Sequence, residues 1–325
     1  MQQPLVSIVM PAYNAERYIA QSVNSILSQT YKNFELLIAD DCSTDRTKEI
    51  LSSFIDSRIL FYHNDSNQGY LKTCNKLFTL CKGNLVTFQD ADDFSLPNRI
   101  EKQVNEFLKN QELGICTSNS VMIDSDGKKI MSRKWAIDYE KFRTDVDYEA
   151  LLCGATIMLK NDLLKEIGLY SEYFNRLGGE DYEWFYRATC KGKGAHLNEE
   201  LYFYRIHNSA VKVNNISPRT IFIHDIIHEI RKHFILHKEY LLDGKHDSEL
   251  KLLEEKFEKE FCDEPSKVYR IKANGAIALK QYGNFLKLSW AAFKAEPLNS
   301  KNYTATITSI YNRFKGIIYN LIKSD

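Results

Sequence analysis

Three carboxylates stand within four positions in the stretch VTFQDADDF (residues 86–94), directly after an apolar run. In an extended backbone, side chains two positions apart point to the same side, so Asp90 and Asp92 can present both carboxylates to one point. Two hard oxygen ligands of this kind suit Mg²⁺ or Mn²⁺, which also bind phosphate oxygens. The same cluster can instead cap the helix expected after Pro97, and the spacing alone leaves both interpretations open.

Two other groups of residues have types and spacing that can do chemistry. Glu180 and Asp181 follow two glycines and begin a helical pattern in LGGEDYEWFYRATCKG (residues 177–192). Acidic residues in a first helical turn also complement the helix dipole, which is their common structural role. Arg205 and His207 are two positions apart at the end of the strand-like run LYFYRIHNSAV, and a lone histidine of this kind is more often structural than a ligand.

The elements that must position these residues alternate between strand and helix. Strand-like runs lie at residues 6–10, 36–39, 59–62 and 85–88, and helical spacing lies between them at residues 15–29, 43–54 and 70–81. This order predicts an α/β fold with a mostly parallel sheet and crossover helices. Ligands of open α/β sheets bind beyond the carboxyl ends of the strands, where Asp40, Asp41 and Asp90 stand.

The later part of the chain has a different pattern. After Pro97 it is mixed, and from about Ser217 it is almost entirely helical. We therefore predict an α/β domain over residues 1–215 and a helical C-terminal domain over residues 216–325. The run Thr306–Lys323 has the pattern of an amphipathic helix, which either packs on its own domain or docks on a membrane surface or partner protein. Its modestly basic polar face favours internal packing.

Composition excludes several classes of protein. The 325 residues are 44% hydrophobic and 12% aromatic, enough to bury one sizeable core and a smaller second one. Lysine plus arginine and aspartate plus glutamate are equal at 43 each, which gives no general affinity for nucleic acid. No G-x-G-x-x-G follows the first strand, which disfavours a dinucleotide oxidoreductase.

Cysteine usage and the N-terminus indicate a compartment. The seven cysteines show no C-x-x-C pair and no zinc-type spacing, which favours reduced cytosolic thiols. The first residues, MQQPLVSIVM, lack a signal-peptide pattern, and no apolar stretch approaches the roughly 18 to 20 residues that span a bilayer. We expect a cytoplasmic protein, soluble or peripheral at the inner face of the membrane.

Several ordered motifs carry a resemblance to a known family. The stretches VSIVMPAYNAERYIAQSVNSILSQTYKNFELLIADDCSTDRT and NDSNQGYLKTCNKLFTLCKGNLVTFQDADD, with the E-D motif at residues 180–181, resemble the family 2 inverting glycosyltransferases. That family includes the type that builds bacterial surface polysaccharides. The resemblance covers residues 5–210 and implies the GT-A nucleotide-sugar-binding fold, a mostly parallel sheet flanked by helices. It does not indicate which sugar is moved.

The resemblance implies residues that bind the nucleotide part of a donor. Pro11 and Tyr13 lie in the loop after the first strand that receives the nucleotide, and the Tyr13 ring can stack on uracil. The second strand ends in Asp40 and Asp41, either of which can accept from the uracil N3–H group. A cap for the following helix is the alternative role of this pair.

The next motif implies donor-binding roles for Asn67 and Gly69, but it also departs from the family. After Asn67-Gln68-Gly69, relatives commonly carry Ala-Arg-Asn, whose arginine is available to phosphate, whereas this chain has Thr73-Cys74-Asn75. Lys72 or Lys76 can supply the missing charge, because residues four apart share a helix face. A solvated lysine face is an equal alternative.

The D-x-D matches the metal-binding motif of the family. By this resemblance, Asp90 contacts the ribose or the sugar, and Asp92 ligates the Mn²⁺ or Mg²⁺ that bridges the two phosphates. Asp93 is a nearby support. Relatives with a Y-R-x-H run use its histidine as a metal ligand and its arginine near the phosphates, which implies these roles for His207 and Arg205.

The E-D motif implies Asp181 as the general base, with Glu180 orienting the acceptor or a neighbouring group. A helix N-terminus keeps such a carboxylate ionised. Trp135 and Trp184 either line an acceptor subsite by stacking on sugar rings or belong to the core.

These residues together predict an inverting, metal-dependent glycosyltransferase of the hexosyl- or N-acetylhexosaminyltransferase class. The donor is a nucleotide sugar, expected to be UDP-linked, and the acceptor is a hydroxyl of a glycan or lipid-linked glycan. One alternative is transfer to a polyprenyl phosphate, which needs no strong base. Another is a non-catalytic nucleotide- or carbohydrate-binding module. Peripheral membrane contact and a homo-oligomer are further hypotheses.

Overall fold

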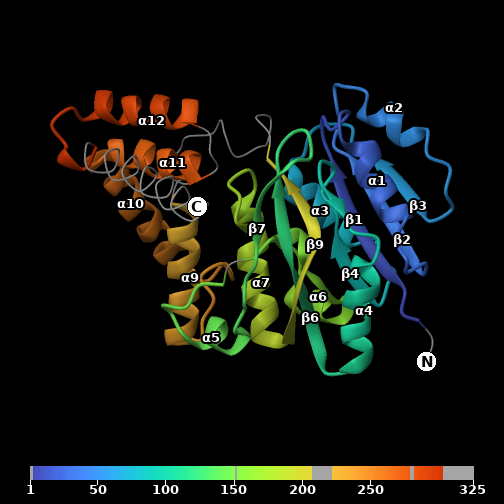
Figure 1. Cartoon of the computed structure of the whole chain (residues 1–325). Helices are drawn as coiled ribbons and strands as arrows, with labels where there is room; N and C mark the ends of the chain where they lie inside the picture. The colour runs from blue at the N-terminus through green and yellow to red at the C-terminus, as the bar shows by residue number, and fades with distance from the viewer. Residues whose placement is uncertain (1–2, 151, 207–221, 279–281, 303–325) are drawn as a thin grey trace, which may run out of the picture. The chain divides into compact units, whose positions relative to one another are not determined.

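The structure is a computed structural model that describes residues 3–150, 152–206, 222–278 and 282–302 (Figure 1). The chain forms two compact units. The first contains Met1–Asn215 and Ile223–His246, and the second contains Ile216–Phe222 and Asp247–Asp325. All but one of the described site residues predicted from the sequence precede residue 200, and the whole predicted site falls in the first unit.

The first unit is built on a mixed sheet, which has nine strands among the described residues. The strands are β1 (Val6–Ala12), β2 (Phe34–Asp40), β3 (Ile59–His63), β4 (Leu85–Phe88), β5 (Phe94–Ser95), β6 (Leu113–Ile123), β7 (Lys129–Arg133), β8 (Met158–Lys160) and β9 (Lys193–Arg205). Their order is β3-β2-β1-β4-β8-β6-β9-β5, with β7 paired to β6. The first four strands pair in parallel, as the sequence predicted, whereas β8 runs antiparallel to both β4 and β6.

Helices cover both faces of this sheet (Figure 1). The helices of the first unit are α1 (Ile19–Leu27), α2 (Thr47–Ser52), α3 (Tyr70–Phe78), α4 (Arg99–Lys109), α5 (Tyr139–Thr144), α6 (Asn161–Ile167), α7 (Glu180–Lys191) and α9 (Ile223–His237), with 3-10 turns η1 (Gly154–Thr156) and η2 (Glu172–Phe174). On one face, α1, α2 and α4 share a core with alternate residues of β1, including Ile8 and Met10. On the other face, Phe78 of α3 lies against Phe88 of β4 and Trp184 of α7. Every residue of β1 and β2 is buried, because helices cover both sides of these strands.

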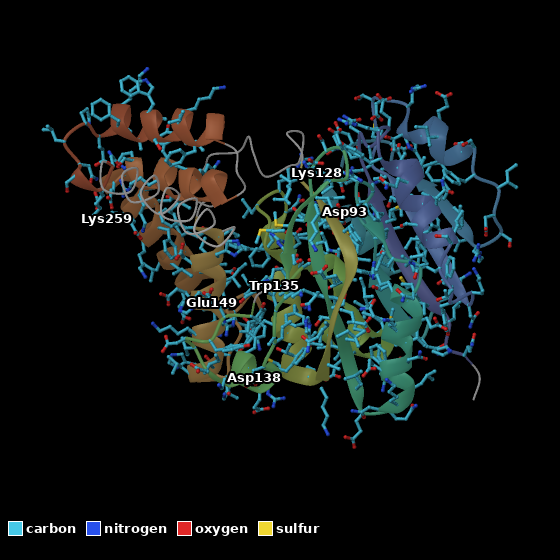
Figure 2. The ribbon with its side chains drawn as sticks, viewed as in Figure 1. Asp93, Lys128, Trp135, Asp138, Glu149 and Lys259 are labelled. Carbon is cyan, nitrogen blue, oxygen red and sulfur yellow. The ribbon has the colours of Figure 1, made fainter. Side chains whose placement is uncertain are left out.

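The two tryptophans singled out in the sequence have different places. Trp184 is fully buried, and its ring stacks on Phe78 with centroids 5.6 Å apart, so it belongs to the core and not to a sugar-binding surface. Trp135, labelled in Figure 2, is half-buried, and its backbone N–H donates to Asn119 Oδ1 at 2.8 Å. Arg133 lies over its ring.

Helix α9 packs on the first unit, although its sequence pattern placed it in the C-terminal domain. Arg231 of α9 is 1% exposed, lies 4.4 Å from the ring centroid of Phe142 and donates to the Phe142 backbone oxygen at 3.0 Å. Ile227 packs so closely on Gly179 that a Cβ there would stand 2.6 Å from Ile227 Cδ1. The division in the structure therefore differs from the predicted boundary at residue 215, because helical periodicity does not show which domain a helix packs on.

The second unit is helical in its described residues, as the sequence predicted. Its helices are α10 (Asp247–Asp263), α11 (Ser266–Ala278) and α12 (Tyr282–Ala295). Phe285 of α12 and Ala273 of α11 form a small buried cluster. The predicted amphipathic helix at residues 306–323 lies outside the described residues. In the part of the chain that the structure describes, no helix is both long enough and apolar enough to cross a membrane.

Candidate active site

The carboxyl ends of β1, β2 and β4 bring the predicted donor residues to one edge of the sheet. Because β1 lies between β2 and β4, the residues at and just beyond these strand ends, Asp40 and Asp90, stand on either side of it. Pro11 is buried within β1, and Tyr13, just after the strand, is 48% exposed. The Tyr13 ring is therefore open to a stacking partner at this edge.

Both carboxylate oxygens of Asp41 accept hydrogen bonds from other residues of the protein. It is 3% exposed, and its Oδ1 accepts from Asn64 Nδ2 and from the Gln68 backbone N–H, each at 2.8 Å. Its Oδ2 accepts from the Gly69 backbone N–H at 2.8 Å. Both carboxylate oxygens thus hold the turn that follows β3, which makes Asp41 the residue that shapes this turn.

Asp40 keeps an acceptor that the protein does not use. Its Oδ2 lies 3.0 Å from His63 Nδ1 and 3.3 Å from the Ser43 backbone nitrogen. Its Oδ1 is buried and has no hydrogen-bond partner in the described part of the chain. Buried polar atoms normally have a partner, so a ligand donor is a fitting complement for this oxygen. Of the two aspartates, Asp40 is the better candidate for contact with a nucleobase N–H.

The turn at residues 67–70 connects Asp41, just after β2, to the D-x-D. Asn67 Nδ2 donates to the Asp41 backbone oxygen at 3.3 Å. Gly69, with φ +89°, precedes α3 in a conformation that side chains rarely adopt. The next residue, Tyr70, donates its hydroxyl to Asp90 Oδ1 at 3.2 Å. The turn therefore spans the space between Asp41 and Asp90.

Within the D-x-D, burial separates the three carboxylates. Asp90 and Asp92 are half-buried, whereas Asp93 is 1% exposed. Asp93 Oδ1 accepts from the Arg205 backbone N–H at 2.7 Å. Burial raises the pKa of Asp93 well above its usual range, and the nearby charges of Asp92 and Asp90 raise it further. Asp93 thus ties the loop to β9, while Asp90 and Asp92 retain access to solvent.

Arg205 holds the D-x-D loop in place. It is 3% exposed, and its guanidinium donates to the Asp92 backbone oxygen at 2.7 Å and to Gln21 Oε1 at 2.8 Å. It also donates to the backbone oxygens of Asp124 and Ser125, each at 3.2 Å. Asp93 is next to Asp92 in the sequence, and Lys128 follows Asp124 and Ser125. Figure 2 shows these two labelled residues at the same end of the sheet. These four bonds use four of the five guanidinium N–H groups, so at most one, on Nη2, is left for the direct phosphate contact that the resemblance implied.

A second buried arginine braces the strand that leads to the D-x-D. Arg99 is fully buried and donates to the backbone oxygens of Phe88 at 2.8 Å and Ala155 at 2.9 Å. Burial lowers the pKa of Arg99 to about 10. Its guanidinium also lies over the Tyr202 ring, whose hydroxyl oxygen accepts from the Asp90 backbone N–H at 3.1 Å. Arg99 therefore links the end of β4, just before the D-x-D, to η1.

The two lysines considered as phosphate ligands are engaged elsewhere. Lys72 Nζ lies 3.2 Å from Glu172 Oε2, and both side chains are substantially exposed. Lys76 Nζ donates to Asn64 Oδ1 at 2.7 Å, beneath the turn that Asp41 holds. Lys76 therefore braces the turn, and Lys72 forms a surface ion pair of the weakly stabilising kind.

Asp181 stands at the first turn of α7, pressed against a glycine of η1. Its Oδ1 accepts from the Tyr182 backbone N–H at 2.8 Å. A Cβ on Gly154 would lie 2.1 Å from Asp181 Oδ2 and 2.8 Å from its Cγ. Real Cβ contacts do not reach such distances, so the position of this carboxylate depends on the absence of a side chain at residue 154.

The E-D motif and the D-x-D face a common region of the protein. Burial raises the pKa of the Cys74 thiol well above its usual range, and the charges of Asp90, Glu180 and Asp181 raise it further. The pKa of the Tyr170 hydroxyl is raised by burial and by the same three carboxylates. Charges act on one group in this way only when they lie near it. The contacts agree with this, because η1 lies against Asp181 through Gly154 and is joined through Arg99 to Phe88, two residues before Asp90.

The metal prediction rests on few of the described residues. No three His, Cys, Asp or Glu side chains among them are placed to hold a metal ion together. His207 lies outside the described residues. Asp90 and Asp92 provide two carboxylates with solvent access at the end of β4, a donor set that suits Mg²⁺ or Mn²⁺ when substrate phosphates complete the coordination. The described carboxylates at the end of β4 therefore fit such an ion.

Sequence reasoning did not find Gly154 or the loop residue Arg176, which lies beside the turn at residues 67–70. Neither stands in a motif or a periodic pattern. The only available signal was the absent arginine after Asn67-Gln68-Gly69, which indicated that a cation comes from another part of the chain.

The mixed sheet with helices on both faces and the helical C-terminal unit fit an α/β protein of the GT-A class. Residues 7–168 match the family described as Glycosyl transferase family 2. An uncharacterized glycosyltransferase of Haemophilus influenzae is 35% identical over 187 residues, which are 57% of this chain and 72% of that protein. The protein belongs to glycosyltransferase family 2, as predicted, and is a glycosyltransferase.

Other relatives extend the comparison. The Escherichia coli protein named UDP-Glc:alpha-D-GlcNAc-diphosphoundecaprenol beta-1,3-glucosyltransferase WfaP is 31% identical over 211 residues, 65% of this chain and 80% of that protein. Among solved structures, Staphylococcus aureus TarS 1–349 in complex with UDP-GlcNAc superimposes with a TM-score of 0.58. That likeness covers 94% of this chain and 88% of the other at 16% identity, and it supports the GT-A fold.

Proposed function

We propose that this glycosyltransferase moves a sugar, with inversion, from a UDP-sugar to a hydroxyl group of a lipid-linked glycan. The observation that carries the proposal is the position of η1 between the two acidic motifs: its Gly154 contacts Asp181, and Arg99 joins its Ala155 oxygen to the Phe88 oxygen just before the D-x-D. A donor-side carboxylate and a potential base on the acceptor side are the groups that in-line displacement at a sugar carbon requires.

Recognition of the uridine is assigned to the ends of β1 and β2. The exposed Tyr13 ring would stack on the uracil. The open Oδ1 of Asp40 would accept from the uracil N3–H. Asp41 acts indirectly, since its oxygens are used to hold the turn at Gly69.

The leaving group is a diphosphate, whose charge must be balanced as the bond to the sugar breaks. Asp90 and Asp92 would hold Mn²⁺ or Mg²⁺, which neutralises this charge when bound. Arg205 keeps the loop that carries these carboxylates in a fixed conformation through four oxygens of the protein. Tyr70 orients Asp90 through its hydroxyl.

Asp181 is assigned as the general base that takes the proton of the acceptor hydroxyl. Gly154 sets the position of its carboxylate, and the Tyr182 backbone N–H fixes its orientation. Attack from the side opposite the diphosphate would convert an α-linked donor into a β-linked product. Glu180, at the start of the same helix, would orient the acceptor.

The acceptor assignment rests on relatives. The names of two Escherichia coli relatives, WfaP and WfgD, describe transfer of glucose to α-D-GlcNAc-diphosphoundecaprenol through a β-1,3 linkage. These names support a sugar hydroxyl on a lipid carrier over the alternative of a polyprenyl phosphate. Peripheral membrane contact and a homo-oligomeric state stay predictions.

A donor and acceptor screen tests the proposed function. The full chain is incubated with UDP-glucose, UDP-GlcNAc and other nucleotide sugars, with Mn²⁺ and synthetic lipid-diphosphate-linked sugars as acceptors. We expect release of UDP that depends on one acceptor, and a β linkage in the product by NMR. Binding of UDP without turnover on any donor and acceptor pair would instead indicate the non-catalytic binding module.

Replacing Gly154 with Ala is expected to lower kcat by about 100-fold with little change in the Kd for UDP, since a misplacement of about 1 Å can cost this much. The added methyl would overlap the Asp181 carboxylate, which must then move away from the acceptor. Steady-state kinetics and calorimetry on the purified variant check this result.

The control uses the coupling between the two residues. In the Asp181→Ala background, two of the three Asp181 atoms that crowd residue 154 are gone, so Gly154→Ala should lower Tm less than it does in the wild-type background. Equal losses of Tm in both backgrounds, with wild-type kcat in Gly154→Ala, would mean that Asp181 does not need this glycine.

A further inference from the structure

The segment between α6 and α7 runs along α3 and ends beside the turn at residues 67–70. Asn75 of α3 exchanges two hydrogen bonds with the Tyr170 backbone, each at 2.9 Å. One turn earlier on the helix, Lys72 pairs with Glu172. The contacts therefore proceed in register toward the start of α3, where the next residues of the segment meet Gly69.

Arg176 is the residue that reaches this turn. Its Nη2 donates to Asn67 Oδ1 at 3.0 Å and to the Asn67 backbone oxygen at 3.2 Å. Its Nε lies 3.8 Å from the point where a Cβ on Gly69 would stand. Arg176 itself has φ +64°, a conformation that residues other than glycine rarely adopt. The exposed guanidinium thus lies along the turn that links Asp41 to Asp90.

Arg176 differs from the other cations around this turn in how its charge is engaged. Arg205 donates to four protein oxygens and is buried, Lys72 is paired with Glu172, and Lys76 donates to Asn64. Arg176 is exposed and forms no ion pair within the described residues. Among the described basic residues close to the turn, it is the one whose charge is not already engaged by a carboxylate or a buried network.

We infer that Arg176 binds the diphosphate of the donor. The inference rests on the proposed function and adds a residue to it. If Asp40 receives the base and Asp90 lies at the sugar end, the diphosphate must cross the turn between them, beside Gly69 and Tyr70. A guanidinium matches phosphate oxygens in charge and in geometry.

Arg176 also joins the two halves of the site. It precedes the E-D motif by only a short loop, in which Gly178 and Gly179 have φ of +83° and +86°. A diphosphate held by Arg176 would therefore contact the loop that leads into α7, whose first residues are Glu180 and Asp181. In this chain the cation for the phosphates comes from the acceptor side of the site, in place of α3, where Thr73-Cys74-Asn75 provides none.

Calorimetry with UDP and with uridine distinguishes phosphate binding from a structural role for Arg176. Both ligands are titrated into wild-type protein, Arg176→Gln, Arg176→Lys and the control Arg143→Gln, in one Mn²⁺-containing buffer. Arg143 is a partly exposed arginine on α5. Gln at 176 can still donate to the Asn67 oxygens, so it removes the charge while retaining a means of holding the turn.

The expected result is a loss of UDP affinity of roughly 10- to 100-fold in Arg176→Gln, with uridine affinity within about twofold of wild type. Arg176→Lys should recover part of the loss, and Arg143→Gln should behave as wild type. Equal losses for UDP and uridine would show that Arg176 only shapes the turn, and unchanged UDP binding would likewise overturn the inference.

The same titrations separate this inference from the proposed function. If wild-type protein prefers another nucleoside diphosphate, such as GDP, the uridine assignment fails, and the comparison of GDP with guanosine still tests Arg176. If wild-type protein binds no nucleoside diphosphate at all, both the proposed function and the inference are overturned.

Discussion

Replacing Asp181 with Asn is expected to lower kcat for sugar transfer by about 10²- to 10⁴-fold, the range that a general base contributes. The Kd for UDP should stay within about twofold of the wild-type value, because the proposed nucleotide contacts are at the ends of β1 and β2. Kinetics with the acceptor from the donor screen, together with calorimetry for UDP, measure the two quantities separately.

The Asn substitution isolates the proton acceptor from the packing around it. Asn retains an oxygen that can accept from the Tyr182 backbone N–H, and its side chain has the size of the one that now rests against Gly154. The fold and the position of α7 should therefore be unchanged, and a thermal melt checks this. Asp162→Asn, at an exposed carboxylate on α6, is the matched control and should have wild-type kcat.

Full activity in Asp181→Asn would change the assignment of the acceptor. A hydroxyl nucleophile needs a base to take its proton, whereas a phosphate acceptor is already ionised at neutral pH and needs none. Retention of transfer would therefore favour a polyprenyl phosphate as the acceptor over a sugar hydroxyl. A loss in Glu180→Gln as large as that in Asp181→Asn would instead place the base at Glu180.

The fold class and the acidic motifs could be predicted because their signals are local. Apolar runs that alternate with helical spacing predict crossover helices, and carboxylates that follow strands must gather at one edge of a sheet. The direction of strand β8, which is antiparallel to its neighbours, could not be predicted, because a short strand-like run does not show in which direction the strand runs. For the same reason, the sequence analysis predicted more parallel character than the whole sheet has.

The roles of individual residues were harder to predict when they depend on distant segments. Arg205 was expected near phosphate, and this stays a prediction. The structure adds that its bonds go to Gln21, Asp92 and a loop at residues 124–125, which no local pattern connects. Gly154 matters only because Asp181 packs on it. Such requirements arise from tertiary contacts, and a single sequence does not display them.

Tertiary contacts also determine where α9 packs, and they place it against the start of α7. Ile227 of this helix rests on Gly179, the residue that caps the start of α7 and precedes Glu180. Arg231 secures the helix by donating to backbone oxygens of the segment after β7, within a pocket of aromatic rings. The N-terminal turn of α7, which carries the assigned base, is therefore supported by chain that follows residue 215.

Removal of the divalent cation is expected to abolish transfer, and Asp92→Asn should lower kcat/KM by about 10²- to 10⁴-fold, since a cation contributes several kcal/mol of charge stabilisation. Activity in EDTA should return on addition of excess Mn²⁺ or Mg²⁺.

The choice of Asp92 follows from its contacts in the D-x-D loop. Arg205 binds the Asp92 backbone oxygen and the Asp93 carboxylate, so substitution of the Asp92 side chain leaves both of these bonds in place. The half-buried Asp92 side chain can lose its charge without unfolding the loop. Substitution of the buried Asp93 would also disturb its bond from the Arg205 backbone N–H.

In Asp92→Asn, half-maximal activation should require a higher Mn²⁺ concentration than in wild type, a change that simple loss of folded protein would not produce. Wild-type activity in EDTA would reject the metal role, and the diphosphate charge would then have to be balanced by side chains, with Arg176 the first to examine.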